Sequence, residues 1–492
     1  MQKPITLNEF QELAKTTARV LIAEEIAADY LTPTSIFEAL HTEMRGGALL
    51  ESGVKDIGTG RYSFLCFDVM AQIVIKDGQV LEKVGKHTEQ KNIDPIQGLR
   101  QFIQKYRCPQ QNEIVGLAGG VVGYLAYDAV RIMEKIPEHK IKNAALPDVL
   151  FNAYRKNLAF DHDQQKVIIA INVEVTGNTE KDYADAMQEI ADIIKKINNF
   201  SFTKISITSE NKTYSAEPQS LVSDQVFMQQ VEKAKQHVVS GDVFQVVLSR
   251  SFTMPFKVSP FSIYRGLRRT SPAPFMFYLD FPDFTVTGAS PEKMACLESG
   301  KVSVNPIAGT RPRNKTVPDQ QIIENLLSDT KETAEHMMLV DLARNDLGII
   351  CQPGTIKVDE LMQARVYSHV IHLTSTVSGQ INPAQDAFDV LKATFPAGTL
   401  SGAPKIRAME IINEIEEAPR GLYGGAICCI DNSGNLNSCI AIRMAILKDN
   451  VAKIQTGAGI VYDSNPAAEA AETQHKARSI VEAIKFAEQH FM

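Results

Sequence analysis

Residues 425–455 read GAICCIDNSGNLNSCIAIRMAILKDNVAKIQ, in which three mostly apolar runs are separated by two short polar turns. The runs cover residues 425–431, 436–447 and 451–455, and apolar runs bounded by turn residues are typical of strands. The turns, Asn-Ser-Gly-Asn and Lys-Asp-Asn, are too short for a crossover connection, so successive strands must pair antiparallel. This stretch therefore predicts an antiparallel sheet near the C-terminus.

Elsewhere, helical and strand-like patterns follow one another without a regular repeat. Residues 223–240 carry apolar side chains at helical spacing, with Gly241 placed to end the helix. Residues 329–343 form a second helical pattern, with Asp329 and Glu332 as a capping box. Further strands are expected at residues 72–75, 167–171 and 244–252. The pattern predicts an α+β fold with prominent antiparallel sheet rather than a Rossmann fold or a barrel.

The chain has 492 residues, which exceeds the size of one compact core. Residues 195–217 are rich in Lys, Ser, Thr and Asn and are the best candidate for a linker. We therefore expect an N-terminal region at residues 8–175 and a C-terminal region at residues 218–485.

Net charge and cysteine content exclude some classes of binding partner and indicate the cellular compartment of the protein. A net charge of -7 argues against a nucleic-acid partner or an anionic membrane surface, which need a basic face. No apolar run reaches the roughly 18 residues that span a bilayer, and the N-terminal MQKPITLNEF lacks the apolar core of a secretion signal. Seven cysteines without a C-x-x-C pair fit reduced thiols, so we expect a cytoplasmic protein.

A glycine-rich loop at residues 395–410, FPAGTLSGAPKIRAME, leads directly into a helical pattern. Gly398 and Gly402 allow a ligand to approach the backbone closely, and Pro404 suits the first helical position. The helix start offers free N–H groups to an anion, although the order of a phosphate-binding P-loop is absent. By itself the loop is either an ordinary helix cap or part of a ligand site.

Two carboxylates occupy unusual helix positions. Glu335 lies on the apolar stripe of its helix, and Glu472 shares a face with Ile480 and Ala483. A carboxylate on an apolar face is costly unless a positive charge meets it. That partner is either a basic side chain or a hard cation; without a His or Cys cluster nearby, two carboxylates suit Mg²⁺ completed by water and a substrate oxygen.

Arg443 and His372 are further candidates for chemistry. Arg443 stands among small residues in an expected strand, where it either holds a carboxylate in a recess or reaches solvent. The stretch TGAG (456–459) ends the next expected strand and offers backbone N–H donors. His372 alternates with apolar neighbours and is either a structural histidine or an acid–base residue. These patterns indicate a carboxylate-binding site and do not name a substrate.

A series of motifs in the C-terminal half carries a resemblance to a known family. The motifs are GDVFQVVLSR (241–250), PIAGTRPR (306–313), TAEHMMLVDLARND (333–346), FPAGTLSGAPK (395–405), YGGA (423–426), IAIR (440–443), TGAGIV (456–461) and AET-x-x-KA (471–477). Through them the chain resembles the chorismate-utilising enzymes, most closely those that form anthranilate. The N-terminal part matches more loosely, through LLES (49–52), GRYSF (60–64) and GGVVGYLAYD (119–128). The resemblance implies two facing, mainly antiparallel sheets with helices packed outside.

The resemblance also implies roles for the candidate residues. Glu335 and Glu472 match the Mg²⁺ ligands that anchor the ring carboxylate of chorismate, and His372 matches the acid–base residue that helps to release pyruvate. Thr399 would line the side from which the nucleophile enters. The residues expected to hold the substrate and its carboxylates are Gly309, Thr310, Tyr423, Arg443, Gly457, Ala458 and Gly459.

Two positions distinguish activities within this family. Members that add water resemble one another in carrying Lys where this chain has Gln245, because water needs a general base. Members that make 4-amino-4-deoxychorismate generally carry Lys where this chain has Ala308. The pair Gln245 and Ala308 therefore implies addition of ammonia, then loss of the ring hydroxyl and of pyruvate to leave anthranilate, the first committed step of tryptophan biosynthesis. The alternatives are a 4-amino-4-deoxychorismate or isochorismate enzyme, and a non-catalytic sensor that kept the fold.

The resemblance implies two partners besides chorismate. Since the chain has no G-x-C-x-G nucleophile, ammonia would come from a separate glutamine amidotransferase subunit. LLES and SPAPFMFYL (271–279) resemble the L-tryptophan-binding segments of feedback-inhibited members, which implies an inhibitor pocket and makes residues 8–175 regulatory and residues 218–485 catalytic. The pocket residues are Ser52, Pro274, Phe275 and Met276. The match is altered at Ser271 and Phe275, where Asn and Tyr are common.

Overall fold

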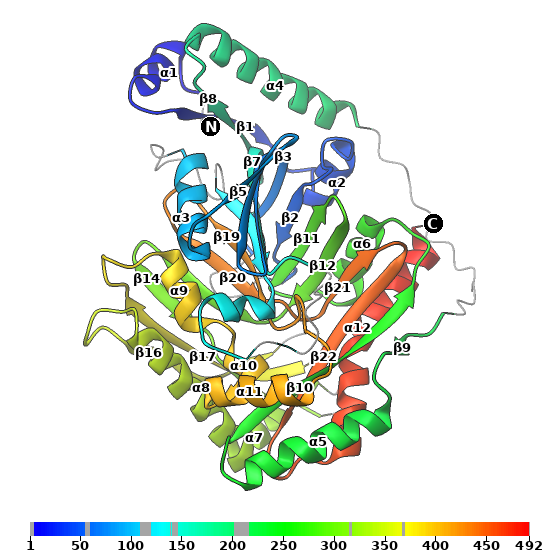
Figure 1. The fold of residues 1–492 in the computed structure, drawn as a ribbon. Helices are drawn as coiled ribbons and strands as arrows, with labels where there is room; N and C mark the ends of the chain where they lie inside the picture. Colours follow the sequence, from blue (N-terminus) through cyan, green and yellow to red (C-terminus); the bar gives the residue numbers. More distant parts are fainter. Residues whose placement is uncertain are drawn as a thin grey trace.

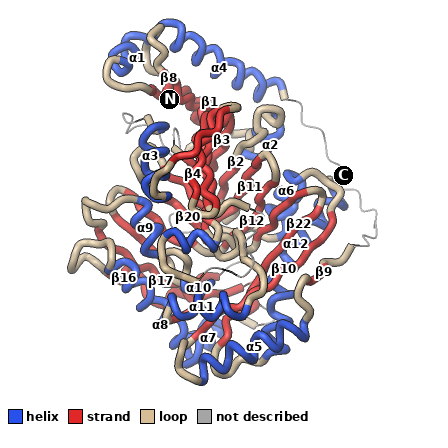
Figure 2. Tube along the Cα trace, viewed as in Figure 1, coloured by secondary structure: helices blue, strands red, loops and turns tan. Residues whose placement is uncertain are grey.

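The computed structural model describes residues 4–54, 60–108, 120–137, 139, 146–200, 216–313, 317–366 and 370–491. Within these residues every strand pairing is antiparallel, and the pairings join the strands into one continuous network. Strands occupy the middle of the molecule and helices surround them (Figures 1 and 2). The predicted α+β fold with antiparallel sheet is confirmed.

Two long strands, β3 (Tyr62–Lys76) and β7 (Val149–Asp161), pair at the centre of this network. One arm runs outward from β3 through β2 (Ala48–Glu51), β11 (Phe275–Phe281), β12 (Phe284–Ser290), β21 (Met444–Lys448), β22 (Val451–Ile460) and β10 (Gln245–Pro255). The other arm runs from β7 through β6 (Val121–Leu125), β19 (Ala426–Ile430), β20 (Leu436–Ile440), β13 (Lys293–Glu298), β14 (Lys301–Val304) and β17 (Val370–Gln380). The remaining strands are β1 (Arg19–Ala27), β4 (Gln79–Val84), β5 (His87–Lys91), β8 (Lys166–Glu174), β9 (Gln219–Ser220), β15 (Ile307–Pro312), β16 (Lys357–Val366) and β18 (Gly402–Ala403).

An apolar cluster packs the two arms against each other. Phe277 and Val286 of the first arm share this buried cluster with Tyr124, Ile427 and Cys439 of the second. Because inward-facing residues of both arms interdigitate, the arms form two facing sheets, as the family resemblance implied.

Helices cover the outer faces and ends of the sheets (Figure 1). α6 packs on α12, and both contribute to the large apolar cluster that covers β10 and β22. The helices are α1 (Leu7–Ala14), α2 (Pro33–Ala39), α3 (Pro95–Tyr106), α4 (Thr179–Asn199), α5 (Asp224–Val239), α6 (Pro260–Thr270), α7 (Asp319–Ser328), α8 (Thr330–Gly348), α9 (Ala387–Thr394), α10 (Gly398–Ser401), α11 (Lys405–Ile415) and α12 (Pro466–His490), with a 3-10 turn η1 (Tyr127–Ile132).

Most elements predicted from the sequence are present. α5 begins after Ser223 and ends before Gly241, and the three isolated strand predictions fall in β3, β8 and β10. Asp329 caps α8 by accepting hydrogen bonds from two backbone N–H groups. The second half of the predicted capping box is replaced, because the Glu332 carboxylate instead pairs with Arg311 at 2.7 Å.

Two boundary predictions need correction. The single strand expected at residues 436–447 is wrong, because β20 ends at Ile440 and β21 begins at Met444. Arg443 lies in this break with φ of 50°, a left-handed conformation that interrupts the alternation of a strand. The linker expected at residues 195–217 begins inside α4, which continues to Asn199, and its residues 201–215 lie outside the described residues.

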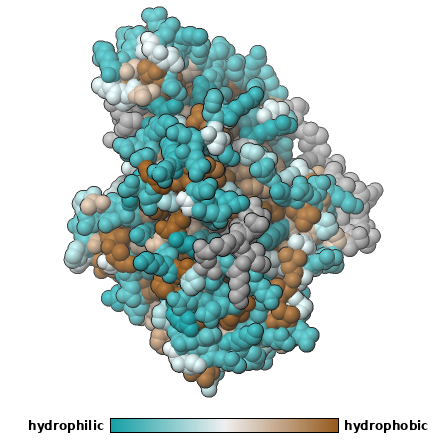
Figure 3. Space-filling view, in the orientation of Figure 1, coloured by the Kyte–Doolittle hydropathy of each residue, from teal (hydrophilic) through white to brown (hydrophobic). Residues whose placement is uncertain are grey.

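The N-terminal and C-terminal regions share the same sheets. β2 pairs with β11, and β6 pairs with β19, so each arm contains strands from both regions. The face seen in Figure 3 is largely hydrophilic with scattered apolar patches. Among the described helices, none combines the length and apolar character needed to cross a membrane.

Candidate active site

The glycine-rich loop folds as α10, the two residues of β18, and α11. A Cβ on Gly402 would lie 2.1 Å from the Gln245 carbonyl oxygen, and its φ is 136°, so the position requires glycine. Pro404 is the N-cap of α11, so the first helical residue is Lys405 and not Pro404 as predicted. The loop presents Thr399, whose hydroxyl donates a 2.7 Å hydrogen bond to Glu292 Oε1.

Glu292 is a site residue that the sequence did not reveal. Burial raises the pKa of its carboxyl group to about 7, although the Thr399 hydrogen bond and the charge of Lys476 lower it. A carboxyl group with such a pKa can hold a proton near neutral pH, which suits a general acid. In the sequence Glu292 is one acidic residue in the short connection SPEK between two strands. Acidic residues are common in such connections, so this one could not be identified as a site residue.

Gln245 and Glu335 meet where β10 begins beside α8. The Gln245 amide nitrogen donates a 3.0 Å hydrogen bond to Glu335 Oε1. Burial raises the pKa of Glu335, and the charges of Glu332 and Glu472 raise it further. The structure therefore places Glu335 near a second carboxylate, with a neutral amide against one of its oxygens.

The position predicted for Glu472 on an apolar face is wrong. The buried stripe of α12 contains Thr473, Ala477 and Ile480, whereas Glu472 is exposed and pairs with Lys476 at 2.7 Å. An i,i+4 ion pair on an exposed helix face explains how the charge is tolerated. Its charge still raises the pKa values of Glu335 and Glu469, so the carboxylates of α8 and α12 repel one another across the site.

A divalent cation fits this donor set. Mutually repelling carboxylates lose their repulsion when a cation lies between them, and carboxylate oxygens are ligands that Mg²⁺ prefers. Among the described residues, no three His, Cys, Asp or Glu side chains form a group able to hold a metal ion by themselves. Glu335 and Glu472 would therefore hold a cation only together with water and substrate oxygens.

Arg443 lies in the break between β20 and β21 and faces the same region. Its Nη1 donates a 3.4 Å hydrogen bond to the Lys476 carbonyl oxygen. Burial lowers the pKa of Arg443, while the charges of Tyr423 and Glu472 raise it. The guanidinium is thus enclosed beside Tyr423 instead of extending freely into solvent.

His372 lies on β17 opposite β15. The strand register places His372 across from Thr310, and a hydrogen bond with the Gly309 backbone tends to raise the pKa of the imidazole. Burial has the larger effect and lowers that pKa, and the charge of Arg443 lowers it further. His372 is therefore neutral at pH 7, a form that can accept a proton.

The TGAG stretch lies in β22 rather than at its end, and its two glycines make room for neighbours. A Cβ on Gly457 would lie 2.8 Å from the Tyr423 hydroxyl oxygen, and a Cβ on Gly459 would lie 2.6 Å from the Gln245 amide nitrogen. Ala458 points to the other side of the strand, into an apolar cluster, and offers the site only its backbone. The TGAG stretch of β22 therefore lies against Tyr423 and Gln245.

The segments expected to bind an inhibitor lie side by side. Glu51 pairs in register with Met276, and the Gly53 N–H donates a 2.8 Å hydrogen bond to the Ala273 carbonyl oxygen. Phe275 and Met276 point to opposite faces of β11, because they belong to different apolar clusters. The Glu51 carboxylate is buried and accepts hydrogen bonds from Tyr264 and Arg268 of α6.

Comparison with known proteins agrees with this geometry. The family model of chorismate binding enzymes matches residues 51–482. The chain belongs to this family. Anthranilate synthase component 1 of Aquifex aeolicus is 37% identical over 492 residues, covering 99% of both chains, and that of Acetivibrio thermocellus is 39% identical over 486 residues, covering 98% of both.

Solved structures of similar proteins share the fold. The anthranilate synthase component I of Streptococcus pneumoniae superposes with a TM-score of 0.74 and is 34% identical, covering 87% of this chain and 93% of that one. The menaquinone-specific isochorismate synthase of Escherichia coli has a TM-score of 0.71 at 18% identity, covering 97% of this chain and 98% of that one, and shows the likeness in fold alone.

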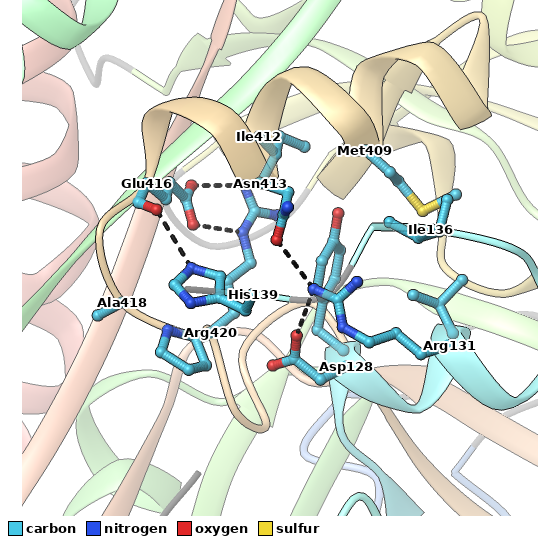
Figure 4. A pocket seen from close by; sticks show the side chains of 13 residues that line it. Asp128, Arg131, Ile136, His139, Met409, Ile412, Asn413, Glu416, Ala418 and Arg420 are labelled. Atoms are coloured by element: carbon cyan, nitrogen blue, oxygen red, sulfur yellow. Dashed lines mark hydrogen bonds and ion pairs between the residues drawn. The ribbon is translucent and has the colours of Figure 1, made fainter. Parts of the chain in front are cut away.

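Next to the site, a small pocket lies between η1 and α11 (Figure 4). Its polar lining includes Asp128, Arg131, His139 and Asn413, with the Glu416–Arg420 ion pair at one end. Arg131 donates hydrogen bonds to Asp128 and Asn413, which closes this side of the pocket.

Proposed function

We propose that the chain converts chorismate and ammonia to anthranilate, pyruvate and water. The observation that carries this proposal is that the partly buried acid Glu292 and the neutral His372 belong to one region with a cation, Arg443, and a pair of carboxylates. The relatives named anthranilate synthase component 1, at 37% and 39% identity over nearly the whole chain, support this activity.

Three groups of residues would bind the dianionic substrate. Arg443 supplies a guanidinium that matches a carboxylate, with Tyr423 beside it. Gly309 and Thr310, and the backbone of Gly457 to Gly459, would approach the ring and its substituents. A bound Mg²⁺, held by Glu335 and Glu472, would neutralise one substrate carboxylate and fix its orientation.

Two proton transfers follow from the pKa values. Glu292, protonated in part near pH 7, would donate a proton to the departing ring hydroxyl, which leaves as water, while Thr399 holds the carboxyl group in place. His372, neutral because it is buried, would serve as the acid–base residue in the later loss of pyruvate.

The nature of residue 245 favours ammonia over water as the nucleophile. The Gln245 amide cannot act as a general base, and its nitrogen already donates to Glu335. Ammonia needs no such base. We therefore infer that a separate glutamine amidotransferase subunit supplies ammonia to this side of the site.

Feedback inhibition by L-tryptophan is the regulatory part of the proposal. The neighbouring positions of Ser52 and the segment 273–276 support a pocket beside the end of β2 and the start of β11. Since Phe275 and Met276 face opposite sides, the indole would pack against Phe275 with Ser52 and Pro274 nearby, and Met276 would contribute from the core. The Glu51 carboxylate, engaged by α6, would act indirectly.

One assay tests the activity. The purified chain is mixed with chorismate, Mg²⁺ and ammonium at high pH, and the products are identified by mass. Anthranilate and pyruvate in equal amounts are expected. Isochorismate or 4-amino-4-deoxychorismate as the stable product would replace this proposal by one of its alternatives, and unchanged chorismate would favour a sensor.

A further inference from the structure

A buried ion pair lies directly behind the proposed reacting groups. Arg420 is 3% exposed and meets Glu416 through two hydrogen bonds, of 2.9 Å to Oε2 and 2.7 Å to Oε1. Both residues come from the end of α11 and the turn after it, and their pairing is visible in Figure 4. Neither side chain is among the groups assigned to substrate or metal.

The pair forms hydrogen bonds with α10 and β10, the two segments that contain Thr399 and Gln245. Arg420 donates hydrogen bonds of 2.6 Å to the Leu400 and Val247 carbonyl oxygens. Glu416 accepts 2.7 Å and 3.0 Å hydrogen bonds from the backbone N–H and hydroxyl of Ser249. Leu400 adjoins Thr399, and Val247 lies two residues beyond Gln245 on the same strand.

The same guanidinium also contacts two tyrosine rings. Its central carbon lies 4.6 Å from the ring centroid of Tyr127 and 5.9 Å from that of Tyr423. Tyr423 is one of the residues proposed to receive the substrate. One side chain therefore touches or borders three elements of the site: α10, β10 and the turn that carries Tyr423.

We propose that Arg420, oriented by Glu416, is a positioning residue that sets the spacing of Thr399, Gln245 and Tyr423 for the reaction. The inference rests on the proposed function and names no contact with substrate. The pair has little value as a stability device, since a buried ion pair is often no more stable than an apolar replacement. A planar guanidinium can hold two carbonyls and a carboxylate at once, whereas an ammonium group cannot do so with the same geometry.

The test compares Arg420→Lys and Glu416→Gln with the wild-type chain in the ammonia-dependent assay. We expect kcat to fall by about 10- to 100-fold, because misplacement by about 1 Å can cost that much, while KM for chorismate changes little. The pH profile gives a second readout. The Thr399 hydrogen bond lowers the pKa of Glu292, so its loss should move the decline of kcat near pH 7 to higher pH. A purely structural role of Arg420 would not shift this decline.

Glu82→Gln is the matched control. The Glu82 side chain, on β4 and away from the site, is 2% exposed and accepts hydrogen bonds from Lys105 and Tyr106 of α3. We expect a loss of thermal stability there without a change in kcat. If Arg420→Lys does not fold, Ser249→Ala, which removes one donor to Glu416, should lower kcat by about fivefold.

Folded Arg420 and Glu416 variants with wild-type kcat and pH profile would overturn the inference. So would a fall in kcat in the Glu82 variant that matches theirs at equal loss of stability. An inactive wild-type chain would instead refute the proposed function, so the two failures are distinguishable.

Discussion

The Thr399 hydroxyl donates a hydrogen bond of 2.7 Å to Glu292 Oε1, which joins the glycine-rich loop to an acid whose pKa is raised to about 7. The two residues are 107 positions apart in the chain. Their contact places a proton donor beside the glycine-rich loop, and it leads to a prediction about pH.

Replacing Glu292 with Gln should lower kcat by about 10²- to 10⁴-fold, the usual contribution of a general acid. At a fixed concentration of free ammonia, wild-type kcat should decline as pH rises through about 7, since the acid must be protonated, and this limb should vanish in the variant. Steady-state rates between pH 6 and 9 provide the measurement. Glu298→Gln, at the exposed end of β13, is the control and should keep the wild-type profile.

The same substitution should increase stability at alkaline pH. The folded-state pKa of Glu292 is raised above its ordinary value. Its favourable contribution to the free energy of unfolding is therefore present at low pH and is lost as pH rises through about 7. A neutral amide avoids this loss. Glu292→Gln should therefore raise Tm by about 2 °C at pH 8 and leave it unchanged near pH 4.5. A lower Tm for the variant at pH 8 would contradict the assignment of a strained, desolvated carboxylate.

Glu335→Gln should abolish turnover and leave the fold intact, because Asp329 still caps α8. Mg²⁺ should raise the Tm of the wild-type chain by binding only the folded state, and this rise should be absent in the variant. Calorimetric titration with Mg²⁺ provides a readout independent of activity. Glu324→Gln, on the exposed face of α7, should behave as the wild type. Full activity of Glu335→Gln in the presence of a chelator would falsify the metal proposal.

Ser52→Phe should relieve inhibition by tryptophan and leave uninhibited turnover nearly unchanged. By linkage, chorismate should weaken tryptophan binding to the wild-type chain by the same factor by which tryptophan weakens chorismate binding, typically ~5–150-fold. Calorimetry with and without chorismate measures both. Ser433→Phe, on the exposed turn before β20, should retain wild-type inhibition. The absence of tryptophan binding to the wild-type chain would remove this part of the proposal alone.

The isolated chain should use ammonium but not glutamine. Burial raises the pKa of every cysteine in the chain above its ordinary value, so none is an activated thiolate of the kind that attacks glutamine. Glutamine-dependent anthranilate formation should appear only after a glutaminase subunit is added. In native buffer, a thiol reagent should label the chain slowly and spare its ammonia-dependent activity; rapid labelling with loss of glutamine turnover would show that the chain has its own glutaminase centre.

Local sequence patterns predicted the helices and strands better than they predicted the breaks within strands. The turns after β19 and β21 made antiparallel pairing certain from the sequence, because their length leaves no other connection. The break at Arg443 was not predictable, since its neighbours alternate as in a continuous strand and the left-handed residue is not glycine. Tertiary packing overrode the local pattern there.

The site residues also differed in how well the sequence predicted them. Glu335 was found because its charge interrupts an apolar stripe, while the apolar face assigned to Glu472 was wrong, since the phase of a long helix is poorly fixed by two apolar residues. The roles of Glu292, Glu416 and Arg420 depend on contacts with residues more than a hundred positions away in the chain, and a single sequence carries no signal for such contacts.

The pairing of β2 with β11 and of β6 with β19 has a consequence for how such a protein can change over time. A sensor module joined by a linker can be exchanged, deleted or moved to another gene, because its edges are complete. Here removal of residues 8–175 would expose the edges of β11 and β19, and unpaired edges invite aggregation. The proposed control and the proposed chemistry would therefore be inherited together, and new regulation would have to arise by substitution within the shared sheets rather than by exchange of whole domains.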